Sequence, residues 1–133
     1  MIREGRPEDA RPLAELVGRA HLHAVGRPAD EGVDELEELW AARLGGGARV
    51  WVWDQNDVVS GVVALAGRDV VSLCVDPTAQ GAGVGAALHE LVLTELGEGE
   101  ARLMAPAESD QSRVFLGERG WREEPEGSGT YVR

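Results

Sequence analysis

The stretch from residue 70 to residue 96 constrains this chain most, because it runs from an apolar segment through three glycines into a helical pattern. Val70–Val75 has the β-branched character of a buried strand, and the leucines that follow from Leu88 recur at helical spacing. Glycines 81, 83 and 85 separate the two. Glycine lets a ligand touch the backbone, and the first turn of a helix offers unpaired N–H groups at the positive end of its dipole. The stretch therefore predicts a phosphate-binding strand–turn–helix unit.

A phosphate site made of backbone amides is important in this chain because basic side chains are scarce. The 133 residues include 13 Lys+Arg against 24 Asp+Glu, a net charge of −11, and every basic residue is Arg. The absence of Lys excludes a Schiff-base lysine and a Walker-type phosphate loop. A surface of this charge repels phosphate backbones, so we expect no nucleic-acid partner. A cationic small molecule or a basic peptide is the more natural partner.

Length and composition bound the class of protein. The length suits one domain over residues 1–133, and 43% hydrophobic residues suffice for a core. One cysteine, Cys74, allows no internal disulfide and no multi-cysteine metal site. The spacing His21-x-His23 is only a weak signal for a metal site, and no other spacing of possible ligands predicts one. With no long apolar run, we expect no membrane segment and a cytoplasmic, bacterial protein.

The periodicity predicts eleven elements in the order β-α-α-β-β-β-α-β-α-β-β. They are a strand at Ile2-Arg3, a helix from Pro7, a helix over 33–44, strands over 48–53, 58–65 and 70–75, a helix over 83–96, a strand over 101–105, a helix over 109–119 and a hairpin over 121–133. Gly61 inside its strand predicts a bulge or a close backbone approach. We expect a single-domain α/β fold with a mixed, mostly antiparallel sheet flanked by helices.

Two kinds of phosphate site fit the glycines. Residues 81–86 satisfy G-x-G-x-x-A, the dinucleotide fingerprint, and Glu100 follows at about the right distance. That fingerprint needs its first glycine directly at the strand end, whereas Asp76–Gln80 intervene here. It also normally begins its fold, and here only residues 102–133 remain to complete a doubly wound sheet. The dinucleotide alternative is therefore the weaker one.

The stronger match is to a family signature. The pattern L-x-V-x-P-x-x-Q-x-x-G-x-G, which ends at Gly85, resembles the acyl-CoA signature of the GNAT N-acetyltransferase superfamily; its residues are Leu73, Val75, Pro77, Gln80, Gly83 and Gly85. The pattern S-x-x-S-x-x-F-L-x-x-x-G-W over 109–121 resembles that family's second motif, N-x-x-A-x-x-F-Y-x-x-x-G-F. The predicted element order over the whole chain also fits the family.

The resemblance implies a site for acetyl-CoA as cosubstrate. Backbone groups of Leu73, Cys74 and Val75 would pair with the pantetheine arm like an added strand. Amides of the turn would hold the pyrophosphate, and these belong to Gln80, Gly81, Ala82, Gly83, Val84 and Gly85. Ser109 and Ser112 would line the side near the thiol. The implied reaction is direct attack of an amine on the thioester in a ternary complex, with the Val75 amide as oxyanion donor.

The match breaks at Leu116, where many family members carry a tyrosine that protonates the leaving thiolate. Leucine cannot donate a proton, but coenzyme A thiolate is a tolerable leaving group near neutral pH. Tyr131, the only tyrosine, is an alternative acid from the terminal hairpin. Its other interpretation is packing at a sheet edge.

The proton of the amine substrate also needs an acceptor. Asp69 is a candidate base because some family members carry a carboxylate there, although Asp is also common in a turn such as this one after Gly67-Arg68. His21 and His23, near the end of the first helix, are alternative bases or exposed residues. We expect His89 on a solvated face and Cys74 as a buried filler rather than a nucleophile.

Two surface features remain open. Trp51 and Trp53 share one face of a strand and either pack in the core or stack on a cationic substrate. The acids between residues 30 and 38 form a solvated face or an electronegative rim that attracts an amine.

The sequence thus predicts an N-acetyltransferase that uses acetyl-CoA and a small, cationic amine or a peptide amine. The alternative is an acyl-CoA-binding regulatory module of the same fold without turnover, which the lack of an obvious acid and base favours. A toxin of this family that acetylates charged tRNA conflicts with the acidity. Monomer and homodimer both remain open, because the terminal hairpin offers an edge for pairing.

Overall fold

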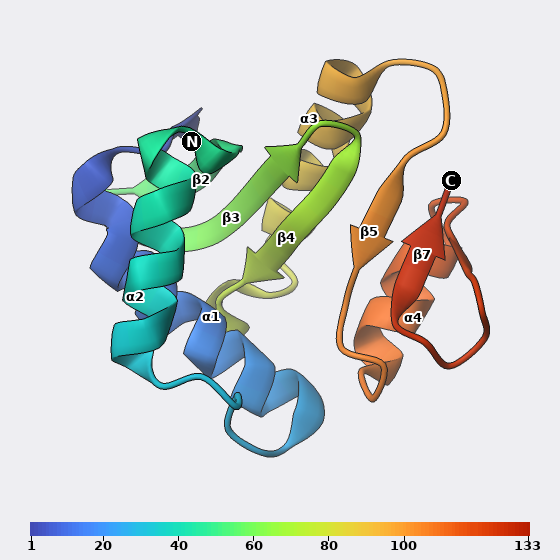
Figure 1. Ribbon diagram of the computed structural model, residues 1–133, viewed down its shortest axis with the longest axis horizontal. Coiled ribbons are helices and arrows are strands. Elements are labelled where there is room, and N and C mark those ends of the chain that lie inside the picture. The colour runs from blue at the N-terminus through green and yellow to red at the C-terminus, as the bar shows by residue number, and fades with distance from the viewer.

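The computed structural model describes residues 1–133, which form one seven-stranded sheet with helices on both faces (Figure 1). The strands are β1 (Ile2–Glu4), β2 (Arg49–Gln55), β3 (Val58–Ala66), β4 (Asp69–Val75), β5 (Arg102–Met104), β6 (Arg122–Glu123) and β7 (Thr130–Val132). The helices are α1 (Ala10–Val25), α2 (Val33–Ala42), α3 (Val84–Leu96) and α4 (Asp110–Gly117). The predicted order of elements and the mostly antiparallel α/β fold are confirmed.

The sheet opens in its middle. The strand order is β1-β2-β3-β4-β5-β7-β6, and every neighbouring pair is antiparallel except β4 and β5. These two parallel strands pair only at Asp69 with Arg102 and at Val70 with Leu103. Beyond Val70 they diverge, as Figure 1 shows. The rest of β4 therefore has β3 on one side and no strand on the other.

Two cores hold the sheet from opposite faces. Alternation along β3 sends Val62 and Ala64 to a cluster with α1 and α2, whose centre is the fully buried Trp40. The same alternation sends Val63 and Leu65 to a cluster with α3, α4 and the C-terminal strands. The second cluster also contains Leu103 of β5 and Tyr131 of β7, so it joins the two halves of the opened sheet.

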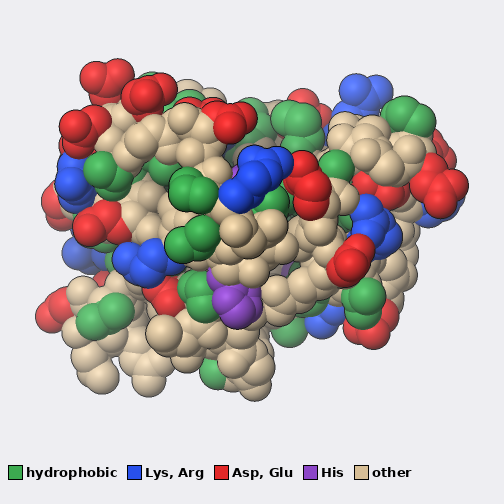
Figure 2. Space-filling model, turned by 90° about the horizontal axis from the view of Figure 1, so that it is seen from below, with side chains coloured by type: hydrophobic (Ala, Val, Ile, Leu, Met, Phe, Trp, Pro, Cys, Tyr) green, Lys and Arg blue, Asp and Glu red, His purple; other side chains and the backbone are tan.

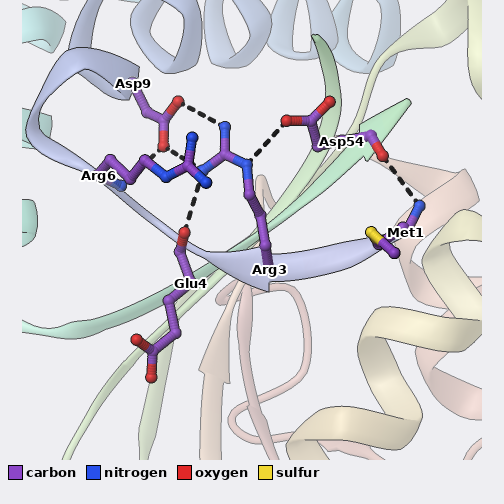
Figure 3. Close-up of polar contacts among 6 residues, drawn as sticks. All are labelled: Met1, Arg3, Glu4, Arg6, Asp9 and Asp54. Atoms are coloured by element: carbon purple, nitrogen blue, oxygen red, sulfur yellow. Dashed lines mark hydrogen bonds and ion pairs between the residues drawn. The ribbon is translucent and has the colours of Figure 1, made fainter. Parts of the chain in front are cut away.

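An ion-pair network ties the N-terminal strand to the sheet (Figure 3). The Arg3 guanidinium donates to both carboxylate oxygens of Asp9, at 2.9 and 3.0 Å, and to Oδ2 of Asp54 at 2.8 Å. Burial disfavours the charged form of Asp9, but hydrogen bonds from Arg3 and from the Arg6 amide outweigh it and hold the pKa of Asp9 below its ordinary value. The network joins β1, β2 and the start of α1 on the side of the molecule away from α4 (Figure 1).

Gly61 allows α3 to lie directly on β3, as the sequence predicted. A Cβ atom at residue 61 would stand 2.8 Å from Cγ1 of Val84 and 3.0 Å from Cδ1 of Leu88. The β2–β3 register also shifts beside it, between Trp53 and Asp54, which is the predicted bulge.

We expect the Gly61→Ala variant to lower the free energy of unfolding by about 1–3 kcal/mol, because α3 must shift to admit the methyl group. Gly18→Ala is the matched control: residue 18 lies inside α1 with nothing within 4 Å of an added Cβ. That change should raise stability by roughly 0.5–1 kcal/mol. Urea unfolding measures both, and equal stability of Gly61→Ala and the natural chain would contradict the close contact.

Candidate functional site

A cavity of about 520 Å³ lies where β4 and β5 diverge. Its walls come from α1, β4, the turn before α3, β5 with the segment after it, and α4. Most of the lining is apolar, and no Asp or Glu side chain contributes to it. The one permanently charged lining residue is Arg119. In a chain of charge −11 the cavity is therefore set apart from the acidic surface.

The β4 wall offers free backbone groups. Asp76 donates its amide to Ser60 of β3 at 2.8 Å, and the direction of backbone groups alternates along a strand. Leu73 and Val75 therefore direct their N–H and C=O groups away from β3, towards the opening. Cys74 directs its backbone groups to β3 and contributes its side chain to the cavity wall instead. Of the three residues expected to pair with a pantetheine arm, two are oriented to do so.

The turn before α3 presents a run of free amides. The first well-formed backbone bond of the helix runs from Ala87 N to Gly83 O at 3.0 Å. From Gln80 to Ala86 no amide donates such a bond to another group of the protein. Gly81 and Gly83 have φ angles of 85° and 83°, and nothing lies within 4 Å of a Cβ added to either. Consecutive N–H groups in such a conformation form a concavity that binds anions.

The predicted turn residues divide between the cavity and the core. Gln80, Gly81, Gly83 and Gly85 line the cavity. Ala82 does not line it, and the Val84 side chain is 3% exposed and packs in the core. Ala82 is exposed outside the cavity and Val84 is buried, so neither adds a side chain to the lining.

An ion pair fixes the turn from the α1 side. Asp76 accepts hydrogen bonds from the Thr78 amide and hydroxyl at 3.0 and 2.8 Å, and from Nη2 of Arg19 at 2.6 Å. Burial disfavours ionised Asp76, but these donors outweigh it and lower the pKa of its carboxyl. The pair joins α1 to the turn, so the two walls of the cavity hold one position relative to each other.

Helix α4 supplies the opposite wall. Ser109, fully buried, caps the helix: its Oγ accepts from the Ser112 amide at 3.1 Å and donates to Ser112 Oγ at 2.9 Å. Ser109 does not line the cavity, whereas Ser112 does. Of the two serines predicted to line the site, only Ser112 does so, because the Ser109 side chain is buried as the N-cap of α4.

Two lining residues were missed by sequence reasoning: Gln111 in α4 and Arg119 just after the end of that helix. Gln111 donates to the side-chain oxygen of Gln80 at 2.8 Å and so bridges α4 to the turn. The Arg119 guanidinium lies 3.7 Å from the Phe115 ring centroid, and that ring is 3.5 Å from the position of a Cβ at Gly85. The i, i+4 spacing of Phe115 and Arg119 was the available signal.

The acid and base candidates do not converge. Asp69 is exposed, at the opposite end of β4 from Val75, roughly 20 Å away at about 3.3 Å per strand residue. Tyr131 is 1% exposed in the core, away from the cavity lining, and burial raises the pKa of its hydroxyl. Leu116 does line the cavity, at the position where the family motif has tyrosine.

Of the two histidines of α1, His21 lines the cavity and its Nε2 atom is buried without a hydrogen-bond partner. His23 is exposed and does not line it. Cys74 also lines the cavity, and burial raises the pKa of its thiol. A raised thiol pKa fits the prediction that Cys74 is a buried, unreactive packing residue rather than a nucleophile.

The tryptophans and the acids of the second helix lie elsewhere. Trp51 and Trp53 are half-buried against the cluster that contains α3, and neither lines the cavity. The acids of 30–38 do not line it either; Asp34 and Glu37 pair with Arg11.

One expectation about α3 is wrong. His89 is 3% exposed rather than solvated, and its Nε2 accepts a hydrogen bond from Trp121 Nε1 at 2.9 Å. The Phe115 ring meets His89 edge-on, with centroids 6.0 Å apart. Sequence periodicity missed this because α3 is covered on two sides, by β3 and by the segment after α4. The bond ties the helix behind the glycine turn to the cavity wall that carries Phe115.

No helix has the length and apolar character to span a membrane. No group of three or more His, Cys, Asp or Glu side chains is placed to hold a metal ion.

Comparison with known proteins connects this geometry to a family. The family model described as an acetyltransferase (GNAT) domain matches residues 26–130. A search of proteins with curated descriptions found no match.

Solved structures share the fold. Apo YjaB from Escherichia coli has 25% identity and a TM-score of 0.73, with 99% of this chain and 92% of YjaB covered. PaiA N-acetyltransferase from Thermoplasma acidophilum, in complex with coenzyme A, has 15% identity and a TM-score of 0.78, with coverage of 99% and 95%. YncA from Salmonella typhimurium, with its cofactor acetyl-CoA, has 22% identity and a TM-score of 0.69, with coverage of 91% and 78%.

The buried His89–Trp121 bond makes stability depend on pH. Burial first, and then the charges of Arg119 and Arg133, lower the pKa of His89 in the folded protein. The unfolded chain therefore binds the proton more readily, so this contribution is complete above the ordinary histidine value near 6.5 and is lost as pH falls towards the lowered value.

Urea unfolding at pH 7.5 and 5.5 tests this dependence. The free energy of unfolding of the natural chain should be lower at pH 5.5. The loss is about 1.4 kcal/mol for each pH unit between the His89 pKa of the unfolded chain and either pH 5.5 or the folded-state pKa, whichever is reached first. His89→Gln, whose amide oxygen can accept from Trp121 without titrating, should show a smaller loss. His23→Gln, the exposed control, should keep the full loss. A His89→Gln profile parallel to that of the natural chain would contradict the assignment.

Proposed function

Because this chain belongs to the GNAT acetyltransferase family, we propose that it transfers the acetyl group of acetyl-CoA to the primary amine of a small acceptor, by direct attack in a ternary complex. The observation that carries the proposal is the run of free amides from Gln80 to Ala86 at one end of a cavity whose β4 wall has unpaired backbone groups. These features match the two ends of the cosubstrate, a pyrophosphate and an amide-containing arm.

The residues present fit acetyl-CoA on three counts. Gly81 and Gly83 leave the space that a phosphate needs against the backbone. Leu73 and Val75 offer strand-type hydrogen bonds to the pantetheine amides. Arg119 supplies the one permanent cation of the cavity and is held in place on the Phe115 ring. When bound, acetyl-CoA supplies the activated thioester.

The chain's own part in the reaction is binding and polarisation. The Val75 amide points into the opening at the end of β4, where it can donate a hydrogen bond to the thioester oxygen as negative charge develops there. A donor of this kind is worth about 2.7–4 kcal/mol in enzymes where it has been removed. Gln111, bonded to Gln80, joins α4 to the turn and so closes the wall around the arm.

The acceptor is a cation when it arrives, since primary amines are protonated at neutral pH. The net charge of −11 attracts such a molecule over distances comparable to the Debye length. The acids of α2 lie outside the cavity and so contribute to this long-range attraction rather than to recognition of the amine. The single free cysteine fits the reducing cytoplasm in which we place the reaction.

A non-catalytic acyl-CoA-binding module is the second candidate. One observation favours it: Leu116 stands at the position of the family's tyrosine, and neither Tyr131 nor Asp69 lines the cavity. Such a module would bind acetyl-CoA through the same amides and β4 groups and would leave the thioester intact.

Thiol release separates the two candidates. The purified chain is incubated with acetyl-CoA and, in turn, benzylamine, spermidine and glycinamide, and free coenzyme A is measured with a thiol reagent. Release that depends on the amine supports the enzyme. Calorimetric binding of acetyl-CoA without release from any amine would favour the module and overturn the proposal.

The Gly83→Glu variant tests the cofactor site. A carboxylate beside the free amides of the turn should weaken acetyl-CoA binding by about 100-fold or more. This loss corresponds to about two charge-assisted hydrogen bonds. Gly83→Asn is the matched control, because asparagine tolerates the positive φ of 83° and adds no charge. Calorimetric titration measures both variants. Unchanged affinity of Gly83→Glu would show that the pyrophosphate binds elsewhere.

A further inference from the structure

The proposed reaction requires a proton acceptor that the site described so far does not contain. The attacking nitrogen must lose one proton, because only the free amine carries a lone pair. The new C–N bond then forms as the C–S bond breaks, and the sulfur leaves as thiolate with its electron pair. The first proton of the acceptor ammonium must therefore pass to a base in or beside the cavity before attack, and a second leaves the acylated nitrogen for the thiolate or solvent.

The cavity lining offers one group for this role. It contains no Asp or Glu, and Asp69 and Tyr131 lie outside it. Cys74 is a poor base, since burial raises the pKa of its thiol and keeps it protonated. Hydroxyl and amide side chains do not accept a proton at neutral pH. His21 remains, and histidine is the side chain that titrates in this range.

The placement of His21 on α1 turns its ring towards the cavity. Val17 and Ala24, four residues before and three residues after it, also line the cavity, so the three side chains share one face of the helix. The Nε2 atom of His21 is buried and has no hydrogen-bond partner in the protein. An unpaired buried polar atom is unfavourable, and its presence in a cavity wall points to a ligand as the missing partner.

The charges around His21 suit a proton acceptor. Glu108, in the segment after β5, has a lowered carboxyl pKa, chiefly through a backbone hydrogen bond and then through Arg27, with the charge of His21 as the last contribution. Glu108 also pairs with Arg27 at 2.8 Å, which partly offsets its charge. On α1 itself Arg19 is neutralised by Asp76, and on β4 the neighbouring Cys74 is neutral.

His21 also has a route to solvent. Figure 2 shows histidine side chains on the surface of the face seen from below, beside hydrophobic ones. On α1, His21 is half-buried and His23 is exposed. A proton taken up in the cavity can thus pass to bulk water at the edge of the same helix.

We infer that His21 is a catalytic residue that removes the proton from the acceptor amine, a role that rests on the proposed acetyl transfer. The ammonium donates one proton to Nε2, and the free amine then attacks the thioester. As the C–S bond breaks, the leaving thiolate or solvent takes the second proton from the acylated nitrogen, and the imidazole passes the first proton to solvent. The same exchange returns His21 to its neutral form.

The test compares His21→Gln with His23→Gln, an exposed histidine two residues away on the same helix. The most reactive of benzylamine, spermidine and glycinamide serves as the protonated acceptor. Methoxyamine serves as a nucleophile that is already neutral at pH 7 and needs no base. kcat is measured by thiol release from pH 5.5 to 9, and acetyl-CoA affinity is measured by calorimetry.

We expect His21→Gln to lower kcat for the protonated acceptor about 100-fold at pH 7, the size of a general-base contribution. The deficit should shrink as pH rises, because the amine then loses its proton unaided. With methoxyamine the variant should lose little, and acetyl-CoA affinity should be unchanged. His23→Gln should match the natural chain throughout.

Two results would overturn the role of His21 while leaving acetyl transfer intact. One is an unchanged kcat and pH profile in His21→Gln. The other is an equal loss with methoxyamine and with the protonated acceptor, which would indicate a structural role for the ring. If the natural chain binds acetyl-CoA but releases no thiol with any nucleophile, the proposed enzyme itself is refuted, and the role of His21 with it.

Discussion

The parallel pairing of β4 and β5 ends after two residue pairs, and the rest of the structure depends on that interruption. A strand inside a sheet normally satisfies its backbone groups on both sides, and unpaired ones are costly when buried. Here the cavity leaves one side of β4 unpaired from Val71 onwards. Those groups can bond to water or to an extended ligand whose amide groups add to the sheet as a strand does.

An opened sheet persists only if other contacts join its two halves. The core cluster beside α3 and α4 does so, because it contains residues of β3 and β4 together with Leu103 of β5 and Tyr131 of β7. Side-chain contacts then set the width of the opening. The Arg19–Asp76 ion pair holds α1 to the turn, and the Gln80–Gln111 bond holds the turn to α4. His89 and Trp121 fasten α3 to the wall that carries Phe115. The cavity is therefore framed by contacts between residues far apart in sequence.

The sequence predicted what local chemistry determines. Glycine spacing, strand alternation and helical periodicity are properties of neighbouring residues, so the glycine turn before α3, the element order and the close approach at Gly61 were all accessible. The missed features depend on packing between distant segments. His89 has Glu90 as a sequence neighbour, and nothing local shows that Trp121 covers it. Asp69 and Val75 belong to one strand, but the length of that strand keeps them apart.

The charge distribution separates the two molecules that the proposed reaction brings together. Acidic side chains dominate the surface and none of them lines the cavity, so a cationic acceptor is attracted to the molecule without a carboxylate there to hold it. The anionic cosubstrate meets the opposite field: free amides, the positive end of α3 and Arg119, all at one end of the opening. A lysine-free chain can bind an anion in this way because backbone dipoles replace basic side chains. The proposed base in the cavity is the His21 imidazole, so a lining without Asp or Glu is compatible with nucleophilic attack by the amine.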